Sequence, residues 1–121
     1  GKIVSVVKIL NIDNNELGKK IAMHIAASSP LAIDKSGLKK EVIDKELEII
    51  KAELINSGKS GDLADKISKG KINKFISDNT LLNQLWIMDP KKKVSDILQE
   101  NKKDKEIKII NFVRFKVGEG V

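Results

Sequence analysis

Both ends of this 121-residue chain have the composition of β-strands, and this limits the available folds more than any other feature. Residues 2–10 are rich in β-branched side chains and almost continuously apolar, which predicts a buried strand. Residues 107–117 form a second predicted strand, and the pattern between the two is mainly helical. We therefore expect an α+β fold: a small antiparallel sheet formed by the terminal strands, packed by helices, with a projecting helical hairpin lobe.

The last strand alternates between apolar and basic side chains. Successive side chains of a strand point to opposite faces of a sheet. The alternation predicts one basic face with Lys108, Arg114 and Lys116. The opposite, apolar face is predicted to hold Ile107, Ile109, Val113, Phe115 and Val117.

The first helix has clear start and stop signals. Asp13 can cap its amino terminus, and Glu16, three residues later, can complete a capping box. Apolar residues at helical spacing continue the helix to about Ser28, and Pro30 ends it. This helix carries His24, the single histidine of the chain, at the edge of its apolar stripe.

Two further helices are predicted, with a turn between them. Apolar residues repeat at helical spacing over residues 38–56 and 62–78, and the glycine-containing segment 57–61 is a turn. Gly70 costs about 1 kcal/mol against alanine, and such a glycine usually marks a close crossing or a break. A fourth, short helix is predicted to start at Asp89-Pro90, because aspartate caps helices and proline favours the first helical position.

The net charge of +6 raises the question of nucleic-acid binding. Base readout favours arginine and base stacking favours aromatic side chains, but the chain has 22 lysines, one arginine, one tryptophan and no tyrosine. The lysines are dispersed among acidic residues, which indicates a solvated surface, so no direct nucleic-acid partner is expected. No apolar run reaches the roughly 20 residues that span a bilayer, so no membrane partner is expected either.

Signals for catalysis are weak. The absence of cysteine excludes disulfides and thiolate chemistry. His24 has no second histidine with which to share a metal, and no serine has a recognisable nucleophile motif around it. Gly58-Lys59-Ser60 resembles part of a phosphate loop, but the earlier glycine and the preceding strand are missing. No catalytic residue and no metal site are predicted.

Two side chains remain open between a structural and a functional interpretation. A histidine beside an apolar stripe, such as His24, is more commonly a buried residue bonded to a carbonyl near the helix end. The alternative is a contact offered to a partner. Trp86, the single tryptophan, is either the anchor of a small core or a hot spot of an interface.

Several stretches of the chain, in the same order, resemble the second half of elongation factor Ts. The most characteristic are residues 17–30, LGKKIAMHIAASSP, and residues 112–120, FVRFKVGEG. The others are residues 41–51, 57–59, 70–75 and 88–90. Together they extend over nearly the whole chain, which is identified as a member of this family.

The resemblance implies a function in translation. Members of the family are guanine nucleotide exchange factors that bind elongation factor Tu with GDP and promote GDP release. They make and break no covalent bond and carry no cofactor, so the chain is not expected to be an enzyme. Exchange of this kind requires different affinities for two conformations of the partner. A cytoplasmic location in a bacterium, or an organelle matrix or stroma in a eukaryote, is expected.

The resemblance also implies partner-binding residues. In the family, a histidine of the IAMHxAA helix and an isoleucine–glycine pair in an early strand contact elongation factor Tu. The matching positions are His24, Ile3 and Val4, with Val4 in place of the glycine. We include Met23, which precedes His24, in the expected contact.

A helical dimerisation lobe is implied at residues 57–106, inserted into a core subdomain of residues 1–56 and 107–121. The segment that often contains Pro-Phe in the family reads Leu-Trp in this chain. The candidate homodimer contacts are Phe75, Leu85 and Trp86.

Two parts of the family are missing from this sequence: the amino-terminal helical module and a Thr-Asp-Phe-Val motif. We therefore expect a piece of a longer protein that keeps part of the binding surface and exchanges nucleotide poorly by itself. One alternative is an interaction or dimerisation module without exchange activity. The other is a lysine-rich RNA-binding domain, against which the scarcity of arginine and stacking aromatics argues.

Overall fold

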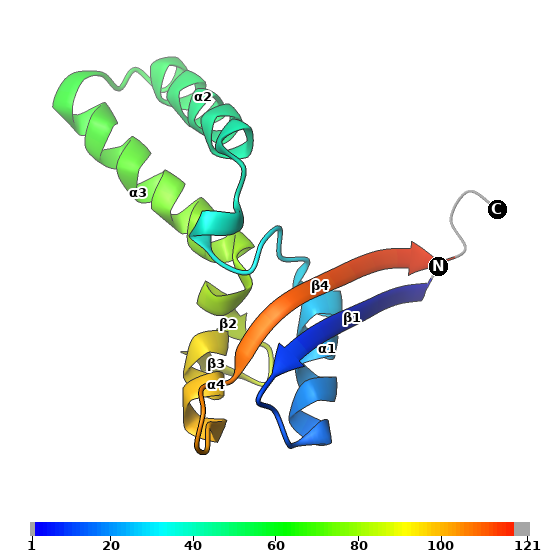
Figure 1. Ribbon diagram of the computed structural model, residues 1–121. Helices are drawn as coiled ribbons and strands as arrows, with labels where there is room; N and C mark the ends of the chain where they lie inside the picture. Colours follow the sequence, from blue (N-terminus) through cyan, green and yellow to red (C-terminus); the bar gives the residue numbers. More distant parts are fainter. Residues whose placement is uncertain (1, 118–121) are drawn as a thin grey trace.

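The terminal strands pair with each other, as the sequence predicts. In the computed structural model, which describes residues 2–117, β1 (Lys2–Leu10) and β4 (Lys108–Val117) form a two-stranded antiparallel sheet. Four α-helices and a second small antiparallel sheet lie between them in sequence. The expected α+β fold, with a small sheet packed by helices, is confirmed (Figure 1).

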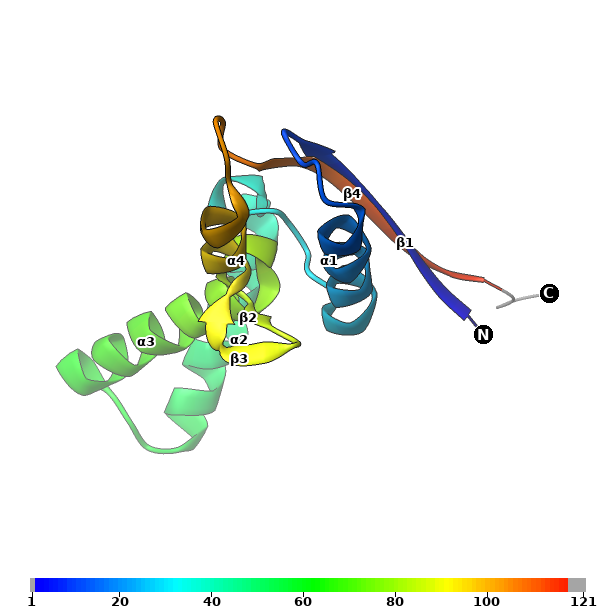
Figure 2. The same cartoon turned by 90° about the horizontal axis from the view of Figure 1, so that it is seen from below.

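Helix α1 (Asn15–Ser28) covers one face of this sheet, and no other described element covers the opposite face (Figure 2). Ser5 and Arg114 are paired across the two strands, so their side chains share a face. The Oγ of Ser5 donates to the carbonyl of Ala22, and Nε of Arg114 donates to the carbonyl of Ala26 at 3.0 Å. These two hydrogen bonds fix α1 against the sheet.

A bulge interrupts the ladder between the two strands. Lys8 pairs with Asn111, but Ile9 pairs with Ile109, so Ile110 has no opposite residue. Side chains along a strand alternate between the two faces of the sheet. One extra residue reverses this alternation, so odd-numbered residues of β4 lie on opposite faces before and after Ile110.

The bulge makes the predicted single apolar face of the last strand wrong. Ile107 and Ile109 are buried, and Ile109 packs beside α1 in the core. Val113, Phe115 and Val117 lie beyond the bulge on the other side of the sheet, where 45–52% of each residue is exposed. A period-two pattern in sequence cannot reveal a residue that the ladder skips.

The prediction that the first strand is buried is also wrong. No residue of β1 is buried, and Ile3, Val6 and Leu10 are exposed. A two-stranded sheet covered by one helix has only one protected face. We call the opposite, uncovered surface the open face. Its apolar residues are Val4, Val6, Leu10, Val113, Phe115 and Val117.

The cap of α1 lies one residue later than predicted. The Oδ1 of Asn14 accepts hydrogen bonds from the backbone N–H groups of Glu16 and Leu17, at 3.0 and 3.3 Å. Asp13 instead forms an ion pair with Lys103 at 2.8 Å. Asparagine and aspartate cap helices about equally well, so the sequence did not distinguish these neighbours.

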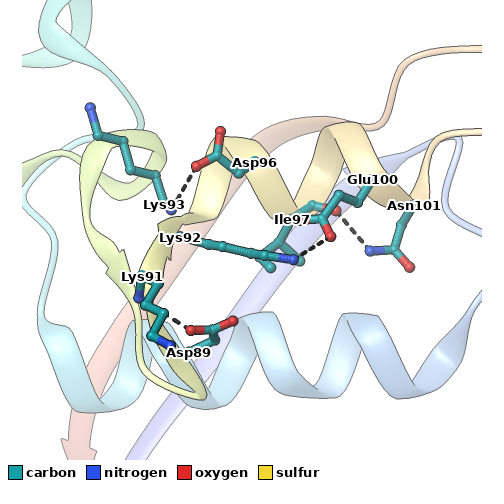
Figure 3. A network of polar contacts seen from close by, with 8 residues as sticks. All are labelled: Asp89, Lys91, Lys92, Lys93, Asp96, Ile97, Glu100 and Asn101. Carbon is teal, nitrogen blue, oxygen red and sulfur yellow. Dashed lines mark hydrogen bonds and ion pairs between the residues drawn. The ribbon is translucent and has the colours of Figure 1, made fainter.

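The helix predicted to start at Asp89 is a strand at that point. β3 (Asp89–Lys93) pairs with β2 (Leu85–Trp86), and α4 (Val94–Asn101) begins four residues after Pro90, the predicted first helical position. The Oδ1 of Asp89 accepts from the N–H of Lys91 at 3.2 Å, within the strand (Figure 3). The cap of α4 comes from Asp96, which accepts from the N–H of Lys93 at 2.9 Å (Figure 3).

Helices α2 (Lys40–Asn56) and α3 (Gly61–Asn79) form an antiparallel hairpin that projects from the rest of the molecule (Figure 1). We call this hairpin the arm. Gly58 in its turn and Gly61, the first residue of α3, have φ of 74° and 66°, in the left-handed region that glycine tolerates. Gly70 lies in a continuous helix with open space around the position of a Cβ, so it marks neither a crossing nor a break.

Two separate hydrophobic clusters divide the chain. The arm has its own cluster, to which Ile50 and Leu54 of α2 and Ile72 and Ile76 of α3 contribute. The other, the core cluster, contains Leu17, Ile21, Ile25, Leu81, Trp86, Val94, Leu98, Ile107 and Ile109. Residues of α2 therefore pack in the cluster of the arm, and Leu81, Trp86, Val94 and Leu98 pack in the core cluster. The lobe expected at 57–106 stays a prediction.

Candidate functional site

His24 lies in the interior of the core with 0% of its surface exposed. Its Nε2 is 3.0 Å from Oε1 of Gln84, and its Nδ1 is 3.3 Å from the backbone nitrogen of Ile87. The ring stacks on Trp86, with 5.3 Å between the ring centroids and 14° between the planes. Both ring nitrogens and one face of the imidazole are therefore engaged within the chain.

The side chain of Gln84 determines which nitrogen of His24 carries the hydrogen. Nε2 of Gln84 donates to the carbonyls of Asp78, at 2.9 Å, and Ser28, at 3.3 Å. Because these two acceptors occupy the amide hydrogens, Oε1 must face the imidazole and accept from it. Nε2 of His24 then donates, and Nδ1 accepts from the N–H of Ile87.

Burial lowers the pKa of His24 below its usual value, and the hydrogen bond to Gln84 offsets only part of this effect. The imidazole is therefore neutral at pH 7. Protonation of Nδ1 would set an N–H group against the N–H of Ile87. A neutral ring with both nitrogens engaged is suited to holding structure in place and is not placed to act as a base or a metal ligand.

Apolar side chains are exposed around this buried histidine. Met23 precedes it on α1 and is 58% exposed, and Leu85 of β2 is exposed to the same extent. Ile87 and Met88 form the exposed turn between β2 and β3. Exposed apolar groups gathered on a surface are typical of sites that bind other proteins.

The remaining predicted partner-binding residues lie on β1. Ile3 is exposed on the side of the sheet that carries α1, whereas Val4 is half-buried on the open face. Ala22 of α1 faces this sheet, and His24 packs on the β2–β3 side of the helix. Met23 and His24 therefore share α1, and the sheet lies between this helix and the side chain of Val4.

The three candidate homodimer contacts do not share a surface. Phe75 is half-buried against the cluster of the arm. Trp86 is 4% exposed and packs in the core, which answers the question left open by the sequence: within this chain it is a core residue. Among the three, only Leu85 is exposed.

Sequence reasoning missed Gln84, whose side chain is the centre of the polar cluster. A signal was present, because Gln84 stands within the otherwise largely apolar stretch from Leu81 to Met88. A polar side chain in such a stretch is buried only if hydrogen bonds compensate for its desolvation. Its partners come from α1 and α3, however, so they could not be read from spacing.

A second surface of interest is the open face. Val4 lies opposite Phe115, and Val6 lies opposite Val113, so their side chains form a continuous apolar strip. Lys8 lies at one end of this strip. Figure 2 shows no other described helix or strand over this side of the sheet.

The described residues form an α+β fold with two exposed apolar surfaces. In the part of the chain that the structure describes, no helix is long and apolar enough to cross a membrane. The comparisons with known proteins agree on one family. The family model described as Elongation factor TS matches residues 1–119.

Individual relatives carry the same name. Elongation factor Ts of Methylococcus capsulatus is 46% identical over 106 residues, which are 88% of this chain and 35% of the relative. Elongation factor Ts of Legionella pneumophila is 40% identical over 121 residues, all of this chain and 40% of the relative. The chain belongs to the elongation factor Ts family, as its sequence motifs predicted, and spans about two-fifths of the length of these relatives.

Proposed function

We propose that the chain is part of a guanine nucleotide exchange factor of protein synthesis. It binds elongation factor Tu in the GDP form and promotes GDP release, in the cytoplasm of a bacterium. The observation that carries this proposal is membership of the family over residues 1–119. Exchange requires binding that differs between two states of the partner and requires no covalent step.

The proposed contact with elongation factor Tu consists of Met23, Ile3, Val4 and His24. Met23 is the most exposed of the four and is available without rearrangement. His24 contributes through its position beneath the turn at Ile87, because its own ring is covered. Direct contact between the His24 ring and a partner requires that this turn move aside.

Calorimetric titration into nucleotide-free elongation factor Tu tests this proposal. We expect saturable binding that added GDP weakens, and a loss of about tenfold in affinity for Met23→Asp, since a buried apolar contact would become a buried charge. Leu63→Asp on the arm is the matched control, because Leu63 is also 58% exposed. Absence of binding by the unmodified chain, or equal loss in both variants, would contradict the proposed contact.

The open face supports a second candidate, an interaction or dimerisation module without exchange activity of its own. Its apolar strip is long enough to be covered by another protein surface. Sedimentation equilibrium of the chain and of Phe115→Asp tests self-association. A dimer that Phe115→Asp dissociates would support this candidate, and a monomer at all concentrations would remove the homodimer from it.

A further inference from the structure

We propose that Gln84 is the positioning residue of the joint between the core and the arm. A single amide caps the last turns of α1 and α3 and holds the imidazole of His24 in one orientation and one tautomer. The state of His24 and the direction of the arm are therefore coupled. This inference goes beyond the proposed exchange function and does not depend on it.

The amide nitrogen of Gln84 bridges two helix ends. The last carbonyls of an α-helix have no partner within the helix and need a donor from elsewhere. Ser28 is the last residue of α1, and Asp78 lies in the last turn of α3. Nε2 of Gln84 donates to both carbonyls, at 3.3 and 2.9 Å, and so joins a core helix to an arm helix.

The backbone of Gln84 is fixed as well, so the amide cannot move freely. Its N–H donates to the carbonyl of Thr80 at 3.0 Å, and its carbonyl accepts from the N–H of Val94 at 3.0 Å. Gln84 is only 6% exposed. The residue is thus anchored to η2 (Leu81–Asn83) and to the first residue of α4 while its side chain reaches α1 and α3.

The orientation of the amide is passed on to the histidine. With both N–H bonds directed at carbonyls, Oε1 remains for Nε2 of His24 at 3.0 Å. The ring in turn accepts from the N–H of Ile87 and stacks on Trp86. Loss of the amide would leave Nε2 of His24 buried without its acceptor, which favours reorientation of the ring.

The arm and the core are also joined by backbone hydrogen bonds of the connecting segments. The N–H of Leu31 donates to the carbonyl of Asn79 at 2.8 Å, and the N–H of Leu81 donates to the carbonyl of Ala32 at 2.9 Å. These bonds hold the two segments together irrespective of residue 84. We therefore expect variants of Gln84 to keep the fold while the arm gains freedom about this connection.

Two variants separate the parts of this role. Gln84→Met has a similar length and removes every polar contact of the side chain. Gln84→Glu keeps an acceptor for His24 but places oxygen atoms against the carbonyls of Ser28 and Asp78. The control is Asn83→Ala, because Asn83 is half-buried and donates only to Oγ1 of Thr80 at 2.9 Å.

The measurements are the ¹⁵N shifts of the His24 ring, which report the tautomer, and the distance between spin labels on the core and the arm. The chain has no cysteine, so Lys19→Cys on α1 and Ser60→Cys beside α3 label it specifically. For Gln84→Met we expect mixed tautomers and a distance distribution about twofold wider. For Gln84→Glu we expect the Nε2–H tautomer to persist and the distribution to widen similarly, whereas Asn83→Ala should match the unmodified chain.

A folded Gln84→Met protein with one tautomer and an unchanged distance distribution would overturn the proposal. Should that variant fail to fold, Gln84→Glu decides: a widened distribution supports the joint, and an unchanged one overturns it. Neither readout requires elongation factor Tu, so failure of the proposed exchange function would leave the result unaffected.

Discussion

The core and the arm use polar groups in different ways. In the core, Ile21, Ile25, Leu81 and Val94 are fully buried around the hydrogen-bonded network of His24. In the arm, Ile50, Leu54, Ile72 and Ile76 retain 4–9% exposure. The buried polar residue of the arm is Ser68, whereas the core and its joint bury His24, Thr80 and Gln84.

This difference shows how the geometry of each part is determined. Hydrogen bonds are directional, so a fully satisfied polar network admits one arrangement of the elements that supply it. Aliphatic contacts between two helices are non-directional and tolerate small shifts. The core thus holds one geometry, and the arm keeps its helices together with a less specific and less enclosed contact.

The largest expected effect is on the free energy of unfolding, and it comes from a matched pair of isoleucine-to-alanine substitutions. Ile21→Ala should lower the free energy of unfolding by about 2–5 kcal/mol, because the site is closed on all sides. Ile72→Ala in the arm should cost about 2 kcal/mol, at the lower end of that range, because α2 and α3 can move together and reduce the volume of the cavity. Urea titrations followed by circular dichroism measure both. Equal losses would remove the distinction between core and arm.

A smaller effect is expected from pH, and it should be confined to the core. The pKa of His24 is lowered in the folded chain from 6.5, so the unfolded chain binds the proton first as pH falls. Stability should be constant above pH 6.5 and decline as the pH falls from there toward the lower pKa of the folded state. Denaturant titrations across this window measure the slope.

His24→Gln is the control for the pH effect. His24 is the only histidine, so no other side chain of the chain ordinarily titrates just below pH 6.5. The variant should be less stable overall but lose the slope near pH 6.5. Parallel curves for the two proteins would show that the buried imidazole is not the source.

The smallest effect compares two glycines of the arm. Gly58→Ala should cost about 1 kcal/mol, because φ is 74° and alanine is strained there. Gly70→Ala should instead add about 0.5–1 kcal/mol, because its backbone is helical and no atom lies within 4 Å of the new Cβ. Thermal unfolding measures both changes. A loss of stability in Gly70→Ala as well would show that the low helix propensity of Gly70 does not limit the stability of the arm.

Elements set by local patterns were predictable from the sequence. The first strand was predicted at residues 2–10 and found there, and the helices predicted at 38–56 and 62–78 are found at 40–56 and 61–79. Periodicity and turn residues lie close together in the chain and need no distant partner. The terminal strands then had one simple way to pair, which the structure adopts.

Features that depend on distant partners were not predictable. Asp89-Pro90 satisfies the local rules for a helix start, but β2 supplies a strand partner that competes with it. Proline is also tolerated in the edge position it takes in β3. For the candidate site, the motif around His24 was visible, whereas its complete burial depends on Gln84, Trp86 and Ile87, sixty or more residues away.

The bulge at Ile110 makes the length of β4 as informative as its composition. The strand has one residue more than the ladder needs, and removal of Ile110 would leave Ile109 opposite Ile9 and Asn111 opposite Lys8. Phe115 would then stay on the open face, and Arg114 would stay on the side of α1. A loop absorbs a one-residue deletion with little consequence. In this strand, the deletion of Ile110 would likewise leave the inside and the outside of the sheet unchanged, because Ile110 has no partner in the ladder.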